Sequence, residues 1–105
     1  MSKIRFFARK EKRLLDKISG NPQEPENYLR LGKLYFLNSD YQKAAEAYRD
    51  GLKIDPRDKS LLFNYAVTRE AQQDLEGAKE LFLEILSIDP NDEEAQKHLD
   101  QITDF

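Results

Sequence analysis

The side chains that most often carry catalysis or bind metals are sparse in this sequence. His98 is the single histidine, cysteine is absent, and no glycine-rich stretch has the spacing of a phosphate-binding loop. A general base needs an orienting partner and a pocket, and we expect His98 at a solvent-facing position of a helix instead. Glu93 and Glu94 stand at an expected helix start, where carboxylates suit the helix dipole. The sequence therefore predicts a protein that is not an enzyme and uses no cofactor or metal.

Charge is divided unevenly along the chain, whose net charge is −3. The first twenty residues carry seven basic and two acidic side chains, which gives this segment a net charge of +5. The remaining residues carry ten basic and eighteen acidic side chains, a net charge of −8. Such a split often marks a segment with its own partner. The alternative is that the basic segment packs across the acidic body, and the charges alone leave both interpretations open.

The basic segment predicts an amphipathic helix. Ile4, Phe7, Leu14 and Ile18 share one face of it, and Glu11 interrupts that face. A helix of this kind can lie on an anionic membrane as a peripheral tether, but a packed helix needs the same apolar stripe. Nucleic acid is not an expected partner, because the rest of the chain is acidic and shows no recognised binding motif. We favour packing and keep membrane contact as the alternative.

The chain repeats itself at an interval of 34 residues. Residues 52–56 and 86–90 both read Leu-x-Ile-Asp-Pro, so two units close in the same way. Further pairs fall on one another at the same interval: Gly32 and Ala66, Asp40 and Asp74, Ala44 and Ala78, Tyr48 and Phe82.

Small residues recur where the two helices of a hairpin would approach closely, at Ala44 and Ala78 and again at Gly32 and Ala66. The proline that closes each unit ends a helix, because it lacks an amide donor and biases the preceding residue away from the helical region. Each hairpin buries only part of its apolar surface, and the next hairpin must cover the rest. The pattern predicts an all-α fold, an α-solenoid of antiparallel helix pairs.

These spacings resemble the tetratricopeptide-repeat family. Its pattern is a large aromatic residue, Leu-Gly, Tyr, a later Ala, an aromatic residue four positions on and a closing Pro. The unit at 25–58 matches at Tyr28, Leu31, Gly32, Tyr35, Ala44, Tyr48 and Pro56. The unit at 59–92 matches less closely, at Leu62, Tyr65, Ala66, Arg69, Ala78, Phe82 and Pro90, with Arg69 where an aromatic residue is usual.

The resemblance implies a superhelix of about six helices, which we expect near 2–19, 24–38, 41–54, 58–72, 75–87 and 92–103. Asp58 and Asp92 are expected N-caps. We predict a single domain over 1–105. Its parts are an N-terminal basic helix at 1–22, repeats at 25–58 and 59–92, and a C-terminal capping helix at 93–105.

The resemblance also implies that the chain binds another protein. In this family the first helix of each repeat lines a concave groove that takes an extended peptide or a partner's helix. By position, the partner-binding residues are Leu29, Arg30, Lys33, Phe36, Phe63, Asn64 and Val67. The four apolar members form a strip that packing within a repeat does not require, unless the N-terminal helix covers part of it. The two basic members favour a partner segment that combines apolar and acidic residues.

One subgroup of the family grips the acidic C-terminus of heat-shock chaperones with a clamp of Lys, Asn and Arg side chains. The corresponding positions here hold Leu29, Lys33, Asn64, Glu94 and His98. Only Asn64 fits, so the sequence predicts no clamp. A homo-oligomer assembled through Phe6, Phe7 or the C-terminal edge is the remaining alternative. We expect a cytoplasmic location, since no secretory signal or membrane-spanning run is recognisable.

Overall fold

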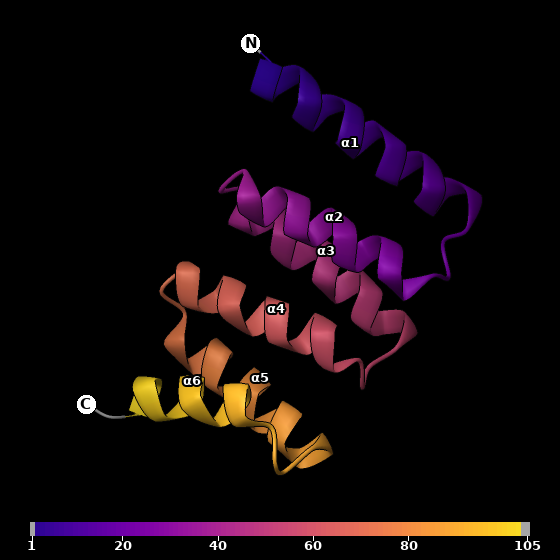
Figure 1. Cartoon of the computed structure of the whole chain (residues 1–105). Coiled ribbons are helices and arrows are strands. Elements are labelled where there is room, and N and C mark those ends of the chain that lie inside the picture. Colours follow the sequence, from indigo (N-terminus) through magenta and orange to yellow (C-terminus); the bar gives the residue numbers. More distant parts are fainter. Residues whose placement is uncertain (1, 104–105) are drawn as a thin grey trace.

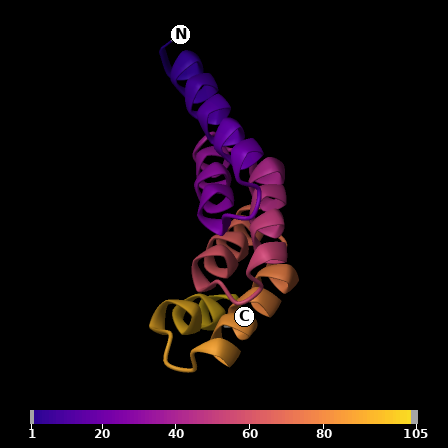
Figure 2. The same ribbon diagram turned by 90° about the vertical axis from the view of Figure 1, so that its right-hand side faces the viewer.

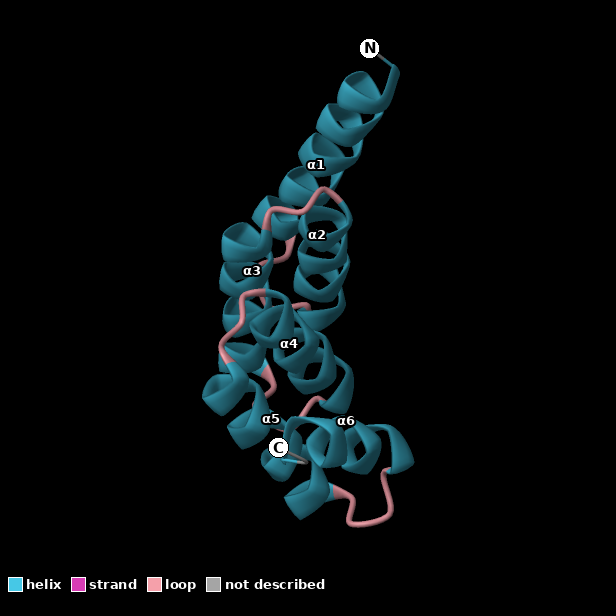
Figure 3. Cartoon of the chain, turned by 90° about the vertical axis from the view of Figure 1, so that its left-hand side faces the viewer, coloured by secondary structure: helices cyan, strands magenta, loops and turns pink. Residues whose placement is uncertain are grey.

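The computed structural model describes residues 2–103, and within them it contains six α-helices and no strand. The helices are α1 (Ser2–Gly20), α2 (Pro25–Leu37), α3 (Tyr41–Ile54), α4 (Lys59–Ala71), α5 (Leu75–Ile88) and α6 (Glu93–Thr103). They stack one after another into an elongated body (Figure 1), and short loops join them (Figure 3). The predicted all-α solenoid is confirmed. Residues 1 and 104–105 of the predicted domain lie outside the described residues.

The second hairpin reproduces the first at the 34-residue interval, down to the ends of its helices. Shifting the bounds of α2 and α3 by 34 gives the bounds of α4 and α5. The turns inside the two hairpins also agree, because Ser39 (φ 60°) and Gln73 (φ 64°) both adopt left-handed backbone. Asp40 and Asp74 then cap the next helices by accepting hydrogen bonds from the backbone N–H groups three residues on.

The expected caps at the starts of α4 and α6 are confirmed. The Asp58 carboxylate accepts a hydrogen bond from the Leu61 backbone N–H at 3.1 Å. Asp92 accepts one from the Ala95 N–H at 3.0 Å. Each bond satisfies one of the amide donors that a helix start leaves without an intrahelical partner.

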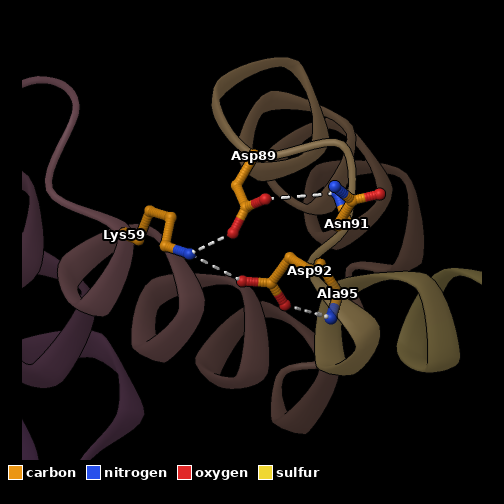
Figure 4. A network of polar contacts seen from close by, with 5 residues as sticks. All are labelled: Lys59, Asp89, Asn91, Asp92 and Ala95. Atoms are coloured by element: carbon orange, nitrogen blue, oxygen red, sulfur yellow. Dashed lines mark hydrogen bonds and ion pairs between the residues drawn. The ribbon is translucent and has the colours of Figure 1, made fainter.

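Lys59 fastens α4 to the loop between α5 and α6 (Figure 4). Its Nζ lies 2.7 Å from an Asp89 oxygen and 3.2 Å from an Asp92 oxygen. The Lys59 hydrogen bond holds the pKa of Asp89 below its usual value, and the bond from the Ala95 N–H does the same for the pKa of Asp92. The two carboxylates in turn raise the pKa of Lys59.

Two apolar clusters fill the interior. The first contains Leu29, Leu31, Tyr35, Ala44, Ala47, Tyr48 and Leu61. The second contains Leu62, Ala66, Ala78, Phe82, Ile85, Ala95 and Leu99. Ala44, Ala66 and Ala78 are fully buried, as their small size predicted. Gly32 is also buried, and a Cβ atom there would overlap the ring of Tyr48.

The basic helix α1 packs on α2 and ends the stack. Phe7, Leu14 and Ile18 lie against the first cluster. Glu11, which interrupts the apolar face, accepts a hydrogen bond from the Tyr35 hydroxyl at 2.7 Å, so it belongs to the interface. The amino-terminal part of α1 projects beyond the α2–α3 pair (Figure 2), and Ile4 there is exposed.

Candidate partner-binding groove

A pocket of about 210 Å³ opens where α2 and α4 lie side by side. Residues three or four apart on a helix share a face, so each helix contributes one short stripe of side chains. The lining residues are Lys33, Phe36 and Leu37 of α2, Tyr48 of α3, and Asn64 and Val67 of α4. A cavity of about 150 Å³ already holds a benzene ring, so this pocket has room for one apolar side chain.

The hydroxyl of Tyr48 is the unusual polar group of this site. Tyr48 is fully buried, and its oxygen has no hydrogen-bond partner among the described residues. The absence of a side chain at Gly32 lets the ring pass close to α2 and reach the pocket. Burial raises the pKa of Tyr48 to about 12, so the hydroxyl is neutral at physiological pH. It can donate or accept one hydrogen bond.

Asn64 supplies a second polar group to the pocket. Its Nδ2 donates to the backbone oxygen of Ser60 at 2.8 Å, which ties the side chain to its own helix. Within residues 2–103 no donor pairs with the amide oxygen, so this acceptor can take a hydrogen bond from a partner. The site therefore offers an apolar wall and one polar acceptor, and the Tyr48 hydroxyl lies buried behind this wall.

Four of the seven predicted binding residues line this one pocket: Lys33, Phe36, Asn64 and Val67. Arg30 lines a neighbouring groove together with Lys33. Phe63 lies on another shallow depression, between α4 and α6, which it shares with Asn64. Six of the seven predicted residues are therefore distributed over three adjoining hollows.

Leu29 is a correction to the expected apolar strip. We expected that packing within the repeat would not require it, but it is only 8% exposed and belongs to the first core cluster. That cluster also contains Leu61 of α4, and Ile18 of α1 packs against it. Leu37, by contrast, is 83% exposed at the rim of the pocket.

The expected solvent-facing position of His98 was wrong. Its ring stacks on Phe82, with centroids 5.0 Å apart, and meets the Phe63 ring edge to face. Its Nδ1 lies 2.9 Å from a Glu70 carboxylate oxygen. Phe63 therefore packs partly against the second cluster, and the His98 ring lies against both Phe63 and Phe82.

Sequence reasoning missed Tyr48 as a member of the site, because the repeat pattern assigns it to packing. The one available signal was its hydroxyl, since the equivalent residue Phe82 packs without one. Two negative observations concern residues 2–103 alone. They hold no cluster of three His, Cys, Asp or Glu side chains that could bind a metal ion, and none of their helices could cross a membrane.

A family model described as tetratricopeptide repeat matches residues 35–102. The general transcriptional corepressor ssn6 of Schizosaccharomyces pombe is 30% identical over 79 residues, which make up 73% of this chain and 7% of that protein. The chain thus corresponds to a small part of that relative.

Solved structures share the fold at low sequence identity. The first TPR domain of Spaghetti (RPAP3), bound to an HSP90 peptide, has a TM-score of 0.87 at 20% identity and covers 97% of this chain and 81% of that one. The type III secretion chaperone SycD of Yersinia enterocolitica, in complex with a peptide of the translocator YopD, has a TM-score of 0.84 at 16% identity. Its match covers 96% of this chain and 82% of that one.

Proposed function

Because the chain belongs to the tetratricopeptide-repeat family, we propose that the face formed by α2 and α4 binds an extended segment of a partner protein. One apolar side chain of that segment enters the pocket above Tyr48. The observation that carries the proposal is this pocket, an apolar hollow with an unpartnered buried hydroxyl. A buried polar group without a partner costs stability, so a ligand that reached this hydroxyl would gain a hydrogen bond to it.

The dimensions of the pocket favour a peptide over a small metabolite. Small-molecule sites usually enclose about 300–1,000 Å³ and surround most of the ligand. The hollow here measures about 210 Å³ and continues into neighbouring grooves, as an elongated ligand requires. The residues that line it offer no nucleophile and base within reach of each other. We therefore propose a binding module without catalytic activity.

Lys33, Phe36, Asn64 and Val67 contact the bound segment in this proposal. Phe36 lies against Tyr41, with ring centroids 5.1 Å apart, so its ring is held in place before the ligand arrives. A preorganised aromatic wall costs little ordering entropy on binding. Arg30 and Phe63 lie to either side and extend the contact, whereas Leu29 acts through the core.

The HSP90 peptide of the solved relative is not the ligand we propose. A two-carboxylate clamp needs cations and amides at five positions, but here Leu29 is buried and Glu94 is acidic. His98, at a further clamp position, stacks on Phe82 and faces Glu70. An acidic chain terminus would lose most of its clamp contacts on this surface.

The experiment is a selection of peptides from a random displayed library on the folded protein. We expect the recovered peptides to share an apolar residue and to bind Val67→Glu at least about tenfold more weakly, as for an interface anchor. Leu83→Glu is the matched control, because Leu83 is an exposed apolar residue of α5 outside the pocket. Equal binding to parent and Val67→Glu, with thermal midpoints unchanged, would remove the pocket from the binding surface.

A further inference from the structure

A second groove lies between α1 and α2 and has a volume of about 340 Å³. Its wall combines five cationic side chains with three leucines and contains no carboxylate. The residues are Lys10, Arg13, Leu14 and Lys17 of α1 and Arg30, Lys33, Leu34 and Leu37 of α2. We call this surface the basic groove.

Most of the charge in the basic groove is not neutralised by the protein. Arg30 pairs with Glu26, through Nε at 3.2 Å from the carboxylate, and both side chains are more than half exposed. The ammonium group of Lys10 lies 4.4 Å from the centroid of the Phe6 ring. Within residues 2–103, Lys10, Arg13, Lys17 and Lys33 have no carboxylate at ion-pair distance. The chain is acidic elsewhere, so this concentration of positive charge is local.

The basic groove is continuous with the pocket above Tyr48. Lys33 and Leu37 line both hollows, so they form the ridge between them. Leu37 is 83% exposed and gives this ridge an apolar crest. A segment that leaves the pocket across Leu37 enters a surface that is lined by leucines and cations.

We infer that the basic groove binds the acidic part of the same partner segment, so that the ligand carries Asp or Glu residues beside its apolar anchor. This inference rests on the proposed function. It adds α1 to the binding surface, because four of the eight residues that line the basic groove belong to that helix. Carboxylates are the complement of a groove with five cations, and arginine can bind them through two parallel hydrogen bonds. The three leucines of the groove fit the methylene and apolar parts of an extended peptide.

Two other polyanions fit the shape less well. A membrane surface is broad and would also meet the acidic body, whose charge repels anionic headgroups. A nucleic acid would meet the same repulsion. A single peptide segment can follow the hollow between two helices without touching the rest of the body. The inference therefore commits to an acidic protein segment.

The test repeats the library selection on two charge-reversal variants of α1. Arg13→Glu with Lys17→Glu reverses two of the five positive charges in the basic groove. Arg5→Glu with Arg9→Glu makes the same change in charge on exposed residues of α1 outside the groove. We expect peptides recovered on the parent and on the control to be enriched in Asp and Glu next to the apolar residue. Peptides recovered on the groove variant should keep the apolar residue and lose the acidic enrichment.

A quantitative arm uses one peptide recovered on the parent, together with its Glu→Gln and Asp→Asn counterpart. We expect the acidic form to bind the parent about tenfold more tightly at low salt, the sum of several exposed ion pairs. This advantage should shrink as salt is added, because screening weakens exposed charge pairs. It should be absent in the groove variant, with helicity and thermal midpoint as checks on folding.

Each contrary result has a distinct meaning. Apolar enrichment without acidic enrichment on the parent leaves the proposed function standing and overturns the inference. No enrichment of either kind overturns the proposed function itself. Equal loss in both charge-reversal variants shows general attraction by α1 instead of recognition by the groove. Binding of phosphatidylserine vesicles that only the groove variant loses would make a lipid headgroup the occupant, and it would overturn the choice of a peptide.

Discussion

Two places in the molecule occupy the same position in the repeat, 34 residues apart, and they differ in whether they are open. In the first, α2 and α4 face Tyr48, and the small Asn64 leaves a pocket. In the second, α4 and α6 face Phe82, and His98 stands where Asn64 stands in the first. The His98 ring lies on Phe82 and meets Glu70, which occupies the place of Phe36.

Backbone geometry and the presence of a pocket are therefore separate properties of these two hairpins. The helices of the two hairpins have matching bounds, turns and caps. The residue on the facing helix is Asn64 in the first place, where it lines a pocket, and His98 in the second, where its ring stacks on Phe82. We expect that space to be adjustable by substitution while the helices stay in place.

The largest expected effect tests whether the two hairpins are packed equally well. Ala44 and Ala78 are both fully buried at the crossing of paired helices. Replacing either with Leu should lower the free energy of unfolding by about 1–3 kcal/mol, because extra methyl groups overpack a fully buried position. Urea denaturation measures the loss, and Ala8→Leu on the exposed surface of α1 is the control. A cost in one hairpin alone would show that their packing differs.

The next prediction exchanges the residues that separate the open place from the filled one. Asn64→His should fill the pocket above Tyr48 and weaken binding of a library-derived peptide by about tenfold, or about 1.4 kcal/mol. His98→Asn should uncover Phe82 and reduce stability by about 1 kcal/mol, since it removes the aromatic contacts of the histidine ring. Fluorescence titration and thermal melts measure the two effects. Unchanged affinity in Asn64→His would contradict the role of pocket volume.

A smaller effect concerns the hydroxyl that distinguishes Tyr48 from Phe82. Tyr48→Phe should stabilise the free protein by about 1 kcal/mol, because it removes a buried hydroxyl without a partner. The same variant should bind the peptide more weakly if the ligand uses that hydroxyl. Phe82→Tyr is the mirror test and should destabilise by a similar amount. A less stable Tyr48→Phe protein would mean that the hydroxyl is already satisfied in solution.

The smallest expected effect is the pH dependence of the Lys59 network, which the first hairpin lacks because Pro25 occupies the equivalent position. The lowered pKa values of Asp89 and Asp92 stabilise the fold above about pH 3.9, their unfolded value. This contribution disappears as the pH falls through the folded pKa values. Parent and Lys59→Met should therefore differ in urea midpoint near neutral pH and converge in acid. Lys53→Met, at an exposed pair, is the control.

The helices and their ends could be predicted from the sequence because local features determine them. Apolar residues recur with helical spacing, aspartates cap the helices that follow, and prolines close the units at 56 and 90. The small residues Ala44 and Ala78 were expected at close helix contacts, and both are fully buried. Even so, the assignment of 25–58 and 59–92 as repeats of a single domain stays a prediction about organisation.

Tertiary contacts between residues far apart in the chain decided which residues of the proposed binding face are exposed. Leu29 and Leu37 have similar side chains on the same helix, yet one is 8% exposed and the other 83%. Leu29 lies in the first core cluster together with Leu61 of α4, whereas Leu37 lies at the rim of the pocket. His98 likewise contacts Phe82 and Glu70 because α6 packs on α5. Burial depends on which helices meet a position, and periodicity specifies the face of a helix but not its neighbours.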